Sequence, residues 1–413
     1  MTTPKLRFKE FDGDWSKNTI QSFMDNNYIL DQMDGNHGEL YPKAEEFSIS
    51  GVPYISATDF SNGEVDFSSC KKLPVQRAKL FKKGIARNGD VLFAHNATVG
   101  PVALLKTDLD FVILSTTATY YRCNHQFLSN QYLKNYFASD YFVQQYFGIM
   151  SQSTRNQVPI TTQRKLSISI PSLEEQTKIA SFLSTVDEKI NQLTQKHQLL
   201  SQYKQGMMQK LFSQQIRFKA DDGSEFGEWK IGKLGDITSI QGGFAFKSTN
   251  FGKGMTKVIR IGDIEKNINL DSFTGIYSNE IPDTRYLISE NAIVMALSGA
   301  TFGKLGKVNQ GYAYINQRVA TFKVFEDSLN EFVYQIMLSQ EFTTYIQSIP
   351  SASAQPNISN QDVINFEMMI PCLEEQTKIA NFLSAIDQKI NVVSGQLEQA
   401  KLWKKGLLQQ MFV

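Results

Sequence analysis

The chain contains 413 residues with a formal net charge of +1, and 41% of its residues are hydrophobic. This length is enough for two or more domains, and the balanced charge excludes a polybasic protein that binds nucleic acid through its whole surface. We expect a cytoplasmic protein without membrane segment, signal peptide or zinc site, because no apolar run approaches about 18 residues and Cys70, Cys123 and Cys372 are scattered.

Residues 1–170 are predicted to form a first globular domain of mixed α/β structure. Its helix is expected at Leu128–Phe147. Its strands are expected at Val52–Ala57, Asp90–Ala94, Val102–Lys106, Phe111–Leu114, Ala118–Cys123 and Leu166–Ile170.

Three stretches of this domain carry residues suited to DNA. A run from Lys71 to Arg87 has seven basic residues and no acidic residue, so it could neutralise phosphates, although a solvated surface is an equally good interpretation. Polar loops follow an apolar strand at residues 95–98 and the predicted helix at residues 151–157, and their side chains suit base edges. The candidates are Lys79, Lys82, Lys83, Arg87, His95, Asn96, Thr98, Arg155, Asn156 and Gln157.

Residues 171–213 are predicted to form one long helix. Apolar residues recur at alternating steps of four and three, which is a heptad seam. The seam residues are Ile179, Leu183, Val186, Ile190, Leu193, Leu200, Met207 and Leu211. His197 and Lys204 interrupt the seam, and Ser172 lies three residues before Glu175, as in a capping box.

Residues 214–370 are predicted to form a second α/β domain with the same order of elements. Its helix is expected at Leu329–Gln347, and its strands at Val258–Ile261, Ala292–Leu297, Gly306–Val308, Val319–Phe325 and Phe366–Ile370. A glycine-rich stretch and two loops equivalent to those of the first domain supply further DNA-binding candidates, although an ordinary turn or connection would look the same. These are Gln241, Gly243, Lys247, Ser298, Thr301, Lys304, Gln355 and Asn357.

Residues 371–413 repeat the first long helix at a spacing of 200 residues, including an interruption at Lys404. A helix of about 40 residues is roughly 60 Å long and exposes its seam unless another helix covers it, so the two copies should pair. An antiparallel pair lets the second domain return to where the first helix ended. Because Leu6-Arg7-Phe8-Lys9 before Trp15 resembles Ile216-Arg217-Phe218-Lys219 before Trp229, we expect a cyclic, pseudo-twofold chain whose termini lie close together.

The two helices are more alike than the two domains. Some identical residues are not needed by the seam, and an identical exposed surface suggests one kind of partner bound twice. Recombination between the copies is an alternative explanation. The partner-binding candidates are Gln176, Lys178, Asp187, Lys189, Asn191, Gln376, Lys378, Asp387, Lys389 and Asn391.

Motifs for covalent chemistry are missing from the sequence. No Walker motif, dinucleotide-binding glycine motif, nucleophile elbow or zinc-protease motif occurs, and the four histidines show no metal-ligand spacing. We therefore expect no catalytic residues, no metal and no cofactor.

The duplicated Pro-x-Leu-Glu-Glu-Gln-Thr-Lys-Ile-Ala openings at Pro171 and Pro371, each closing a variable domain, resemble the specificity subunit of type I restriction-modification systems. The resemblance implies two target-recognition domains that each read half of a split double-stranded DNA sequence, with a helix pair that sets the spacer. It also implies docking of two methyltransferase subunits and association with ATP-dependent translocase-nuclease subunits. The alternative is a coiled-coil scaffold that assembles proteins and reads no DNA, which salt-dependent DNA retention would distinguish.

Overall fold

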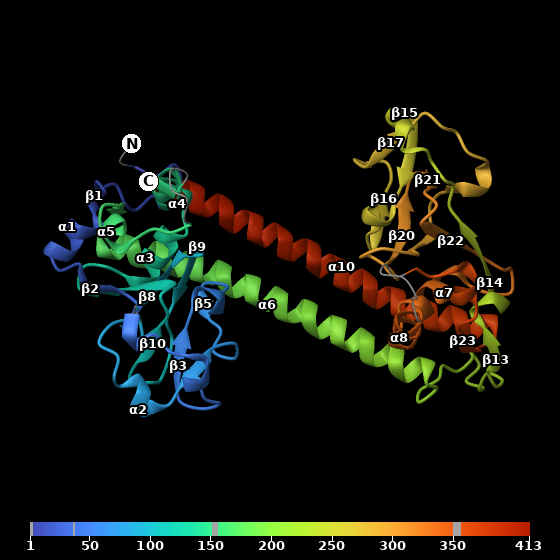
Figure 1. The fold of residues 1–413 in the computed structure, drawn as a ribbon, viewed down its shortest axis with the longest axis horizontal. Coiled ribbons are helices and arrows are strands. Elements are labelled where there is room, and N and C mark those ends of the chain that lie inside the picture. Colours follow the sequence, from blue (N-terminus) through green and yellow to red (C-terminus); the bar gives the residue numbers. More distant parts are fainter. Residues whose placement is uncertain (1–2, 36–37, 151–155, 350–356) are drawn as a thin grey trace. The chain divides into compact units, whose positions relative to one another are not determined.

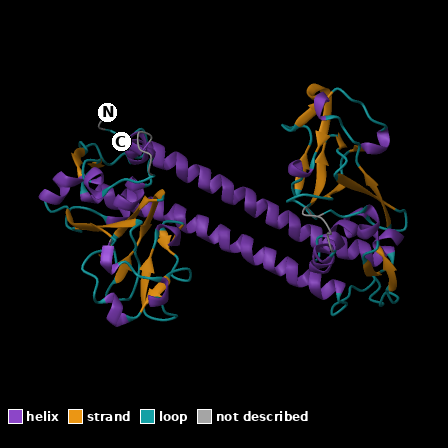
Figure 2. Cartoon of the chain, viewed as in Figure 1, coloured by secondary structure: helices purple, strands orange, loops and turns teal. Residues whose placement is uncertain are grey.

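The computed structural model describes residues 3–35, 38–150, 156–349 and 357–413. The chain divides into two compact units, Met1–Gln195 with Gly395–Val413 and Lys196–Ser394. Each unit contains one globular domain, built from strands and short helices, and a part of each of two long helices (Figures 1 and 2). We call the globular part of the first unit domain 1 and that of the second unit domain 2. The predicted fold class is confirmed.

The described residues of domain 1 form three sheets. Their strand orders are β2-β11-β8-β9-β5-β4, β6-β3-β10-β7 and β1-β12. The pairs β11 with β8 and β8 with β9 are antiparallel, whereas β3 and β10 are parallel. The strands are β1 Ser16–Thr19, β2 Ile29–Asp34, β3 Val52–Ile55, β4 Phe60–Ser61, β5 Glu64–Val65, β6 Lys71–Leu73, β7 Ile85–Ala86, β8 Val91–Asn96, β9 Thr98–Leu104, β10 Val112–Leu114, β11 Ala118–Cys123 and β12 Ser167–Ile170.

Domain 2 repeats this topology although its sequence has diverged. Its described strands have the orders β14-β22-β19-β20-β16, β17-β15-β21-β18 and β13-β23. The parallel pair β15 with β21 corresponds to β3 with β10. The strands are β13 Lys230–Lys233, β14 Thr238–Gly242, β15 Phe251–Ile259, β16 Asn267–Asn269, β17 Ile276–Ser278, β18 Leu287–Ile288, β19 Ile293–Ala296, β20 Leu305–Gln310, β21 Ala313–Ile315, β22 Val319–Val324 and β23 Glu367–Ile370.

The single domain helices predicted at Leu128–Phe147 and Leu329–Gln347 are each two helices. The break lies at Ser139 and Ser339, whose hydroxyls accept hydrogen bonds from the backbone N–H three residues later, at 3.4 and 3.2 Å. A serine in this position caps a new helix and so ends the previous one. The short helices are α1 Ile20–Asp25, α2 Val75–Ala78, α3 Asn130–Phe137, α4 Asp140–Met150, α5 Ile160–Gln163, α7 Asn330–Met337, α8 Gln340–Ser348 and α9 Asn360–Ile364.

Two predicted strands, Val52–Ala57 and Val258–Ile261, end earlier than expected because the chain turns into a short 3-10 helix. These turns are η3 Ala57–Asp59 and η6 Ile261–Asp263. The aspartate at the end of each turn accepts a hydrogen bond from the backbone N–H three residues before it, at 2.7 and 3.0 Å. The same local device therefore ends the same strand in both domains.

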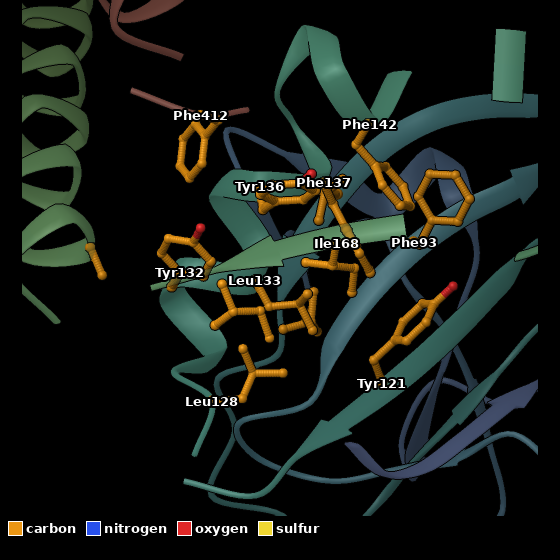
Figure 3. Close-up of a cluster of buried hydrophobic side chains, with 14 of the residues drawn as sticks. Phe93, Tyr121, Leu128, Tyr132, Leu133, Tyr136, Phe137, Phe142, Ile168 and Phe412 are labelled. Atoms are coloured by element: carbon orange, nitrogen blue, oxygen red, sulfur yellow. The ribbon is translucent and has the colours of Figure 1, made fainter. Parts of the chain in front are cut away.

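Aromatic side chains dominate the core of the first unit (Figure 3). Phe137 stacks on Phe142 with ring centroids 4.2 Å apart, and Phe412, from the end of the chain, packs against Tyr132 and Tyr136 at 5.5 and 5.6 Å. The backbone N–H of Leu6 donates to the carbonyl of Gln410 at 2.8 Å. The prediction that the two ends of the chain lie close together is confirmed.

The long helices α6 Leu173–Phe212 and α10 Leu373–Gln410 pair in both units. In the first unit, the start of α6 shares a core with Leu407 and Met411 near the end of α10. In the second unit, Met208 and Leu211 near the end of α6 share a core with the start of α10. The predicted antiparallel pairing is confirmed, although Met208 rather than Met207 is the buried seam residue. No described helix has both the length and the apolarity that crossing a membrane requires.

The lysines that interrupt the seam form ion pairs with an aspartate of the opposite helix. Lys204 Nζ lies 2.6 Å from Asp387 in the second unit, and Lys404 Nζ lies 2.5 Å from Asp187 in the first. The residue numbers of each pair add up to the same value, so both pairs follow one antiparallel register. Burial lowers the pKa of Lys204. Burial would raise the pKa of Asp387, but the hydrogen bonds that it accepts from Lys204, Lys266 and Gln335 lower it on balance.

Each domain is attached to the start of a long helix by a buried glutamate. Glu175 binds the guanidinium of Arg7, and Glu375 binds that of Arg217, with shortest N to O distances of 2.7 Å in both. These hydrogen bonds raise the pKa of both arginines. The repeated Arg-Phe-Lys segments of the sequence therefore occupy equivalent places, one in each unit.

Candidate nucleic-acid interface

Three segments of domain 1 meet at the end of β8. The loop predicted at residues 95–98 is a tight turn between two strands, because His95 and Asn96 belong to β8 and Thr98 begins β9. Asn96 forms an isolated β-bridge with Gln157, and the N–H of Val158 donates to the carbonyl of His95 at 2.8 Å. The N–H of His95 in turn donates to the carbonyl of Thr117 at 3.0 Å. We call residues 95–98, 115–117 and 156–158 the loop end of domain 1.

Domain 2 has an equivalent loop end, made of residues 297–304, 316–318 and 357–358. Ser298 forms the bridge with Asn357, and the N–H of Ile358 donates to the carbonyl of Leu297 at 2.9 Å. The N–H of Leu297 donates to the carbonyl of Arg318 at 2.9 Å. By this shared hydrogen-bond pattern, Asn96 of domain 1 is equivalent to Ser298 of domain 2, Thr117 to Arg318, and Gln157 to Asn357.

Gly243, a DNA-binding candidate from the glycine-rich stretch, closely approaches another backbone segment of its own domain. A Cβ atom on Gly243 would overlap the carbonyl of Asn316, in the loop between β21 and β22. Gly35 has the same relation to Ser115 in domain 1. The close approach therefore joins two backbone segments of the protein, and glycine is needed so that the loop end can pack on the strand below it.

The predicted side chains of domain 1 differ in accessibility. His95 is 1% exposed, so it supports the loop from within and cannot face a ligand. Thr98 and Asn156 are exposed, whereas Asn96 and Gln157 are half-buried, and the amide of Asn156 donates to the carbonyl of Ala97 at 2.9 Å. Arg155 lies outside the described residues.

In domain 2, Lys247, Lys304 and Asn357 are exposed. Ser298 is buried, and the hydroxyl of Thr301 donates to the carbonyl of Ile261 at 3.3 Å, so both hold the loop rather than face outward. Gln241 belongs to β14 and its amide donates to the carbonyl of Gly242. Gln355 lies outside the described residues.

The basic run of domain 1 is not part of the loop end. Strand β3 is parallel to β10, and both strands run toward the loop end. Strand β6 is antiparallel to β3 and runs away from the loop end, because Lys71 lies opposite Tyr54 and Leu73 lies opposite Val52. The helix α2 follows β6, so it lies at the far end of the domain from residues 95–98. The exposed side chains of Lys79, Lys82, Lys83 and Arg87 therefore belong to another face.

Sequence reasoning missed Arg318. It is exposed in the loop between β21 and β22, and its Nη1 lies 3.3 Å from Oδ1 of Asn357. One signal was available, because Arg318 follows an apolar strand just as residues 95–98 do. Its proximity to Asn357, which is 39 residues away, is a property of the tertiary structure alone.

Two of the partner-binding candidates are buried, and the expectation that they are exposed is wrong. Gln176 and Gln376 are each 1% exposed. Their amide oxygens accept hydrogen bonds from the N–H of Ser129 and Leu329, and their amide nitrogens donate to Pro171 and Pro371, at 2.9 to 3.0 Å. Their identity in both copies is explained by the junction between helix and domain.

Four other candidates make contacts within the chain. Asp187 and Asp387 bind the lysines of the seam, Lys178 lies 3.3 Å from Glu10, and Lys378 lies 2.6 Å from Asp221. The remaining candidates are exposed at equivalent positions of the two helices: Lys189, Asn191, Lys389 and Asn391. Among the described residues, no group of three or more potential metal ligands occurs.

A family model described as "Type I restriction modification DNA specificity domain" matches residues 33–201 and 227–402. The type I restriction enzyme MjaVIII specificity subunit of Methanocaldococcus jannaschii is 28% identical over 280 residues, which cover 63% of this chain and 65% of that relative. The alignment thus spans slightly less than two thirds of that relative. The putative MjaX specificity subunit of the same organism is 27% identical over 374 residues, covering 87% of this chain and 85% of the relative.

Solved structures show the same fold. The S subunit of a type I restriction-modification system from M. genitalium superposes with a TM-score of 0.60 at 16% identity, covering 100% of this chain and 99% of the other. A chain from a structure that describes complex assembly and conformational transition of a type I system gives a TM-score of 0.56 at 18% identity, covering 95% and 96%.

Proposed function

Because the chain belongs to the family of type I restriction modification DNA specificity domains, we propose that it is the DNA-recognition subunit of a type I restriction-modification complex. The resemblance seen in the duplicated helices is confirmed by this match, which covers both halves of the chain. In this role the chain performs no covalent chemistry itself. Each domain reads one half of a bipartite double-stranded target.

One observation carries this proposal: the two loop ends share a backbone frame and differ in the side chains that the frame presents. Domain 1 has the half-buried Thr117 and Gln157 where domain 2 has the exposed Arg318 and Asn357, and the same backbone hydrogen bonds hold both sets. Amide side chains pair with adenine edges, and exposed lysines such as Lys304 suit phosphates. A common frame with different side chains suits two readers of the same kind of ligand with different sequences.

The helix pair is proposed to set the spacer between the half-sites. Both α6 and α10 continue without a break from one unit into the other, and paired helices are stiffer than a linker. Recognition in successive major grooves on one side of a duplex requires a separation near one helical turn, about 34–36 Å. Inserting one heptad into both helices should lengthen the required spacer and leave both half-sites unchanged.

The partners in this proposal are two methyltransferase subunits, with ATP-dependent translocase-nuclease subunits joining the complex. The exposed pairs Lys189 with Lys389 and Asn191 with Asn391 offer the same chemistry in both units, which supports one kind of partner bound twice. Lys178 and Lys378 remain candidates at the rim of these surfaces, since both keep a partly accessible ammonium group.

The test is to map methylated adenines in cells that carry this chain with its methyltransferase subunit. We expect one split motif, and we expect an exchange of residues 16–170 for the first domain of another family member to change one half of that motif only. The proposal fails if the complex methylates no split sequence, or if the exchange changes both halves. A spacer preference unaffected by the heptad insertion would refute the role of the helices.

A further inference from the structure

The loop end of domain 2 contains an exposed arginine, Arg318, whose guanidinium binds no carboxylate among the described residues. Several arginines of the chain are bound to carboxylates, as in the pairs Arg77 with Glu46, Arg122 with Asp90 and Arg217 with Glu375. Arg318 is exposed and forms no ion pair with any carboxylate that the structure describes. Its one side-chain hydrogen bond among these residues joins Nη1 to Oδ1 of Asn357 at 3.3 Å.

The backbone on which Arg318 sits is held from two sides. Its carbonyl accepts the N–H of Leu297, and the next N–H, of Val319, donates to the carbonyl of Asn316 at 2.7 Å. Below the loop, Gly243 packs so closely on Asn316 that a Cβ atom would not fit. A side chain on such a fixed turn starts from a defined position, which favours selective binding over loose charge attraction.

The chemistry of the pair identifies the ligand. A guanidinium has five N–H donors in a planar fork, so the bond to Asn357 leaves a face of the fork free. Two parallel donors match O6 and N7 of guanine in the major groove, and no other base offers two adjacent acceptors there. Because Asn357 is neutral, it orients the guanidinium without neutralising its charge.

Among the described residues of domain 1, the position equivalent to Arg318 carries no guanidinium. Thr117 occupies the position of Arg318, and its hydroxyl accepts the N–H of Ala57 at 2.9 Å and lies 2.7 Å from the hydroxyl of Ser115. That side chain is therefore engaged within the domain. The contrast lies at one position of a shared frame, so it should appear as a difference between the two half-sites.

We propose that Arg318 reads a guanine in the half-site of domain 2, and that Asn357 is the positioning residue that orients its guanidinium. This inference rests on the proposed function. Phosphate binding is the competing role for an exposed arginine, and it predicts a different result: weaker binding to every sequence without a change of preference.

The experiment compares the methylation motif of the wild-type complex with those of four variants of the full chain: two at Arg318, one at Asn357 and one control. Arg318→Gln removes both the positive charge and the parallel N–H donors of the guanidinium. Arg318→Lys keeps the charge but loses the parallel donors. Lys323→Gln is the matched control. Lys323 is an exposed lysine on β22, the strand that begins directly after Arg318, and it lies about five residues, or roughly 17 Å, along the strand from Arg318.

We expect both Arg318 variants to lose discrimination at one G·C pair of the domain 2 half-site by roughly 5- to 150-fold. The other half-site and the control should be unchanged. Asn357→Ala should relax the same position to a smaller extent. Domain exchange identifies which half-site belongs to domain 2.

Three results would overturn the inference. These are a domain 2 half-site without guanine on either strand, an unchanged motif in Arg318→Gln, and a uniform loss that Arg318→Lys restores. If Arg318→Gln abolishes methylation, binding of the purified complex to duplexes with single substituted pairs decides between the two roles, because a phosphate contact weakens all duplexes equally. A wild-type complex that methylates no split motif would instead refute the proposed function itself.

Discussion

The ion pair between Lys204 and Asp387 allows a quantitative test of the helix pair. Asp387 accepts hydrogen bonds from Lys204 at 2.6 Å, Lys266 at 2.8 Å and Gln335 at 2.9 Å. The side chains of Lys204 and Asp387 are only 9% and 13% exposed. Replacing Asp387 by alanine therefore leaves the ammonium group of Lys204 buried in the seam without a counter-ion.

The expected cost follows from this burial. Breaking a buried pair by removing one partner costs about 3–5 kcal/mol. The contribution of Lys266 is much smaller, below about 1 kcal/mol, because its side chain is 46% exposed. Lys204→Met removes the charge that is expensive to bury and leaves Asp387 with two partners, so it should cost about 1 kcal/mol or less. The double variant should resemble Lys204→Met and not the sum of the two.

Amide hydrogen exchange of residues 373–394 measures this free energy locally, which a global melting curve of a protein with two units does not. A loss of 3 kcal/mol corresponds to exchange about 100-fold faster. Lys401→Met, measured by exchange of residues 395–410 of the same helix, is the matched control, because its partner Glu398 is 70% exposed and the pair should contribute little. The reasoning is refuted if Asp387→Ala behaves like this control, or if the double variant is as unstable as the two single variants combined.

Three further predictions follow from contacts within the units. The pKa of Asp387 lies below its ordinary value of 3.8, so its stabilising effect is complete above that pH and is lost as the pH falls through the lower, folded value. The opening free energy of residues 373–394, obtained from exchange rates corrected for the intrinsic rate at each pH, should therefore fall less from about pH 5 to 3 in Asp387→Asn than in wild type. Glu375→Gln should destabilise its unit by about 1 kcal/mol more than Glu175→Gln, because Glu375 also accepts the indole N–H of Trp229 at 2.8 Å, and equal effects in hydrogen exchange would contradict this. Gly243→Ala should cost about 1–3 kcal/mol, measured by hydrogen exchange within domain 2, and should disturb the domain 2 half-site, whereas Gly262→Ala, where a Cβ meets no atom within 4 Å, should be tolerated.

Much of the fold could be predicted because its signals are local. The heptad period, the serine cap at Ser172 and the repeated opening sequence lie within single segments, so they indicate the long helices without any knowledge of the fold. Strand Ala118–Cys123 was predicted with its observed limits for the same reason. The broken domain helices were missed because Ser139 and Ser339 are compatible with a helix interior by propensity, and their capping role depends on the turn that they adopt.

The contacts between the loops of the candidate site could not be predicted from local sequence patterns. The loops at residues 95–98 and 151–157 were recognised separately, but no pattern in the sequence indicates that Asn96 pairs with Gln157 or that Arg318 lies beside Asn357. Likewise, the glutamines repeated in the two helices, Gln176 and Gln376, looked like a binding surface because their partners, the backbone groups of Ser129 and Leu329, are 47 residues away.

The sequence by itself determined the duplicated architecture, the helices and their antiparallel direction, because periodicity and chain continuity act along the chain. The tertiary structure alone decided which repeated residues hold the protein together and which remain free for a ligand. The reason is that burial and hydrogen bonding join residues that are distant in sequence. Lys204 looks like an interruption of the seam until the fold places Asp387 beside it, and Arg318 looks like any other exposed arginine until the fold places Asn357 beside it.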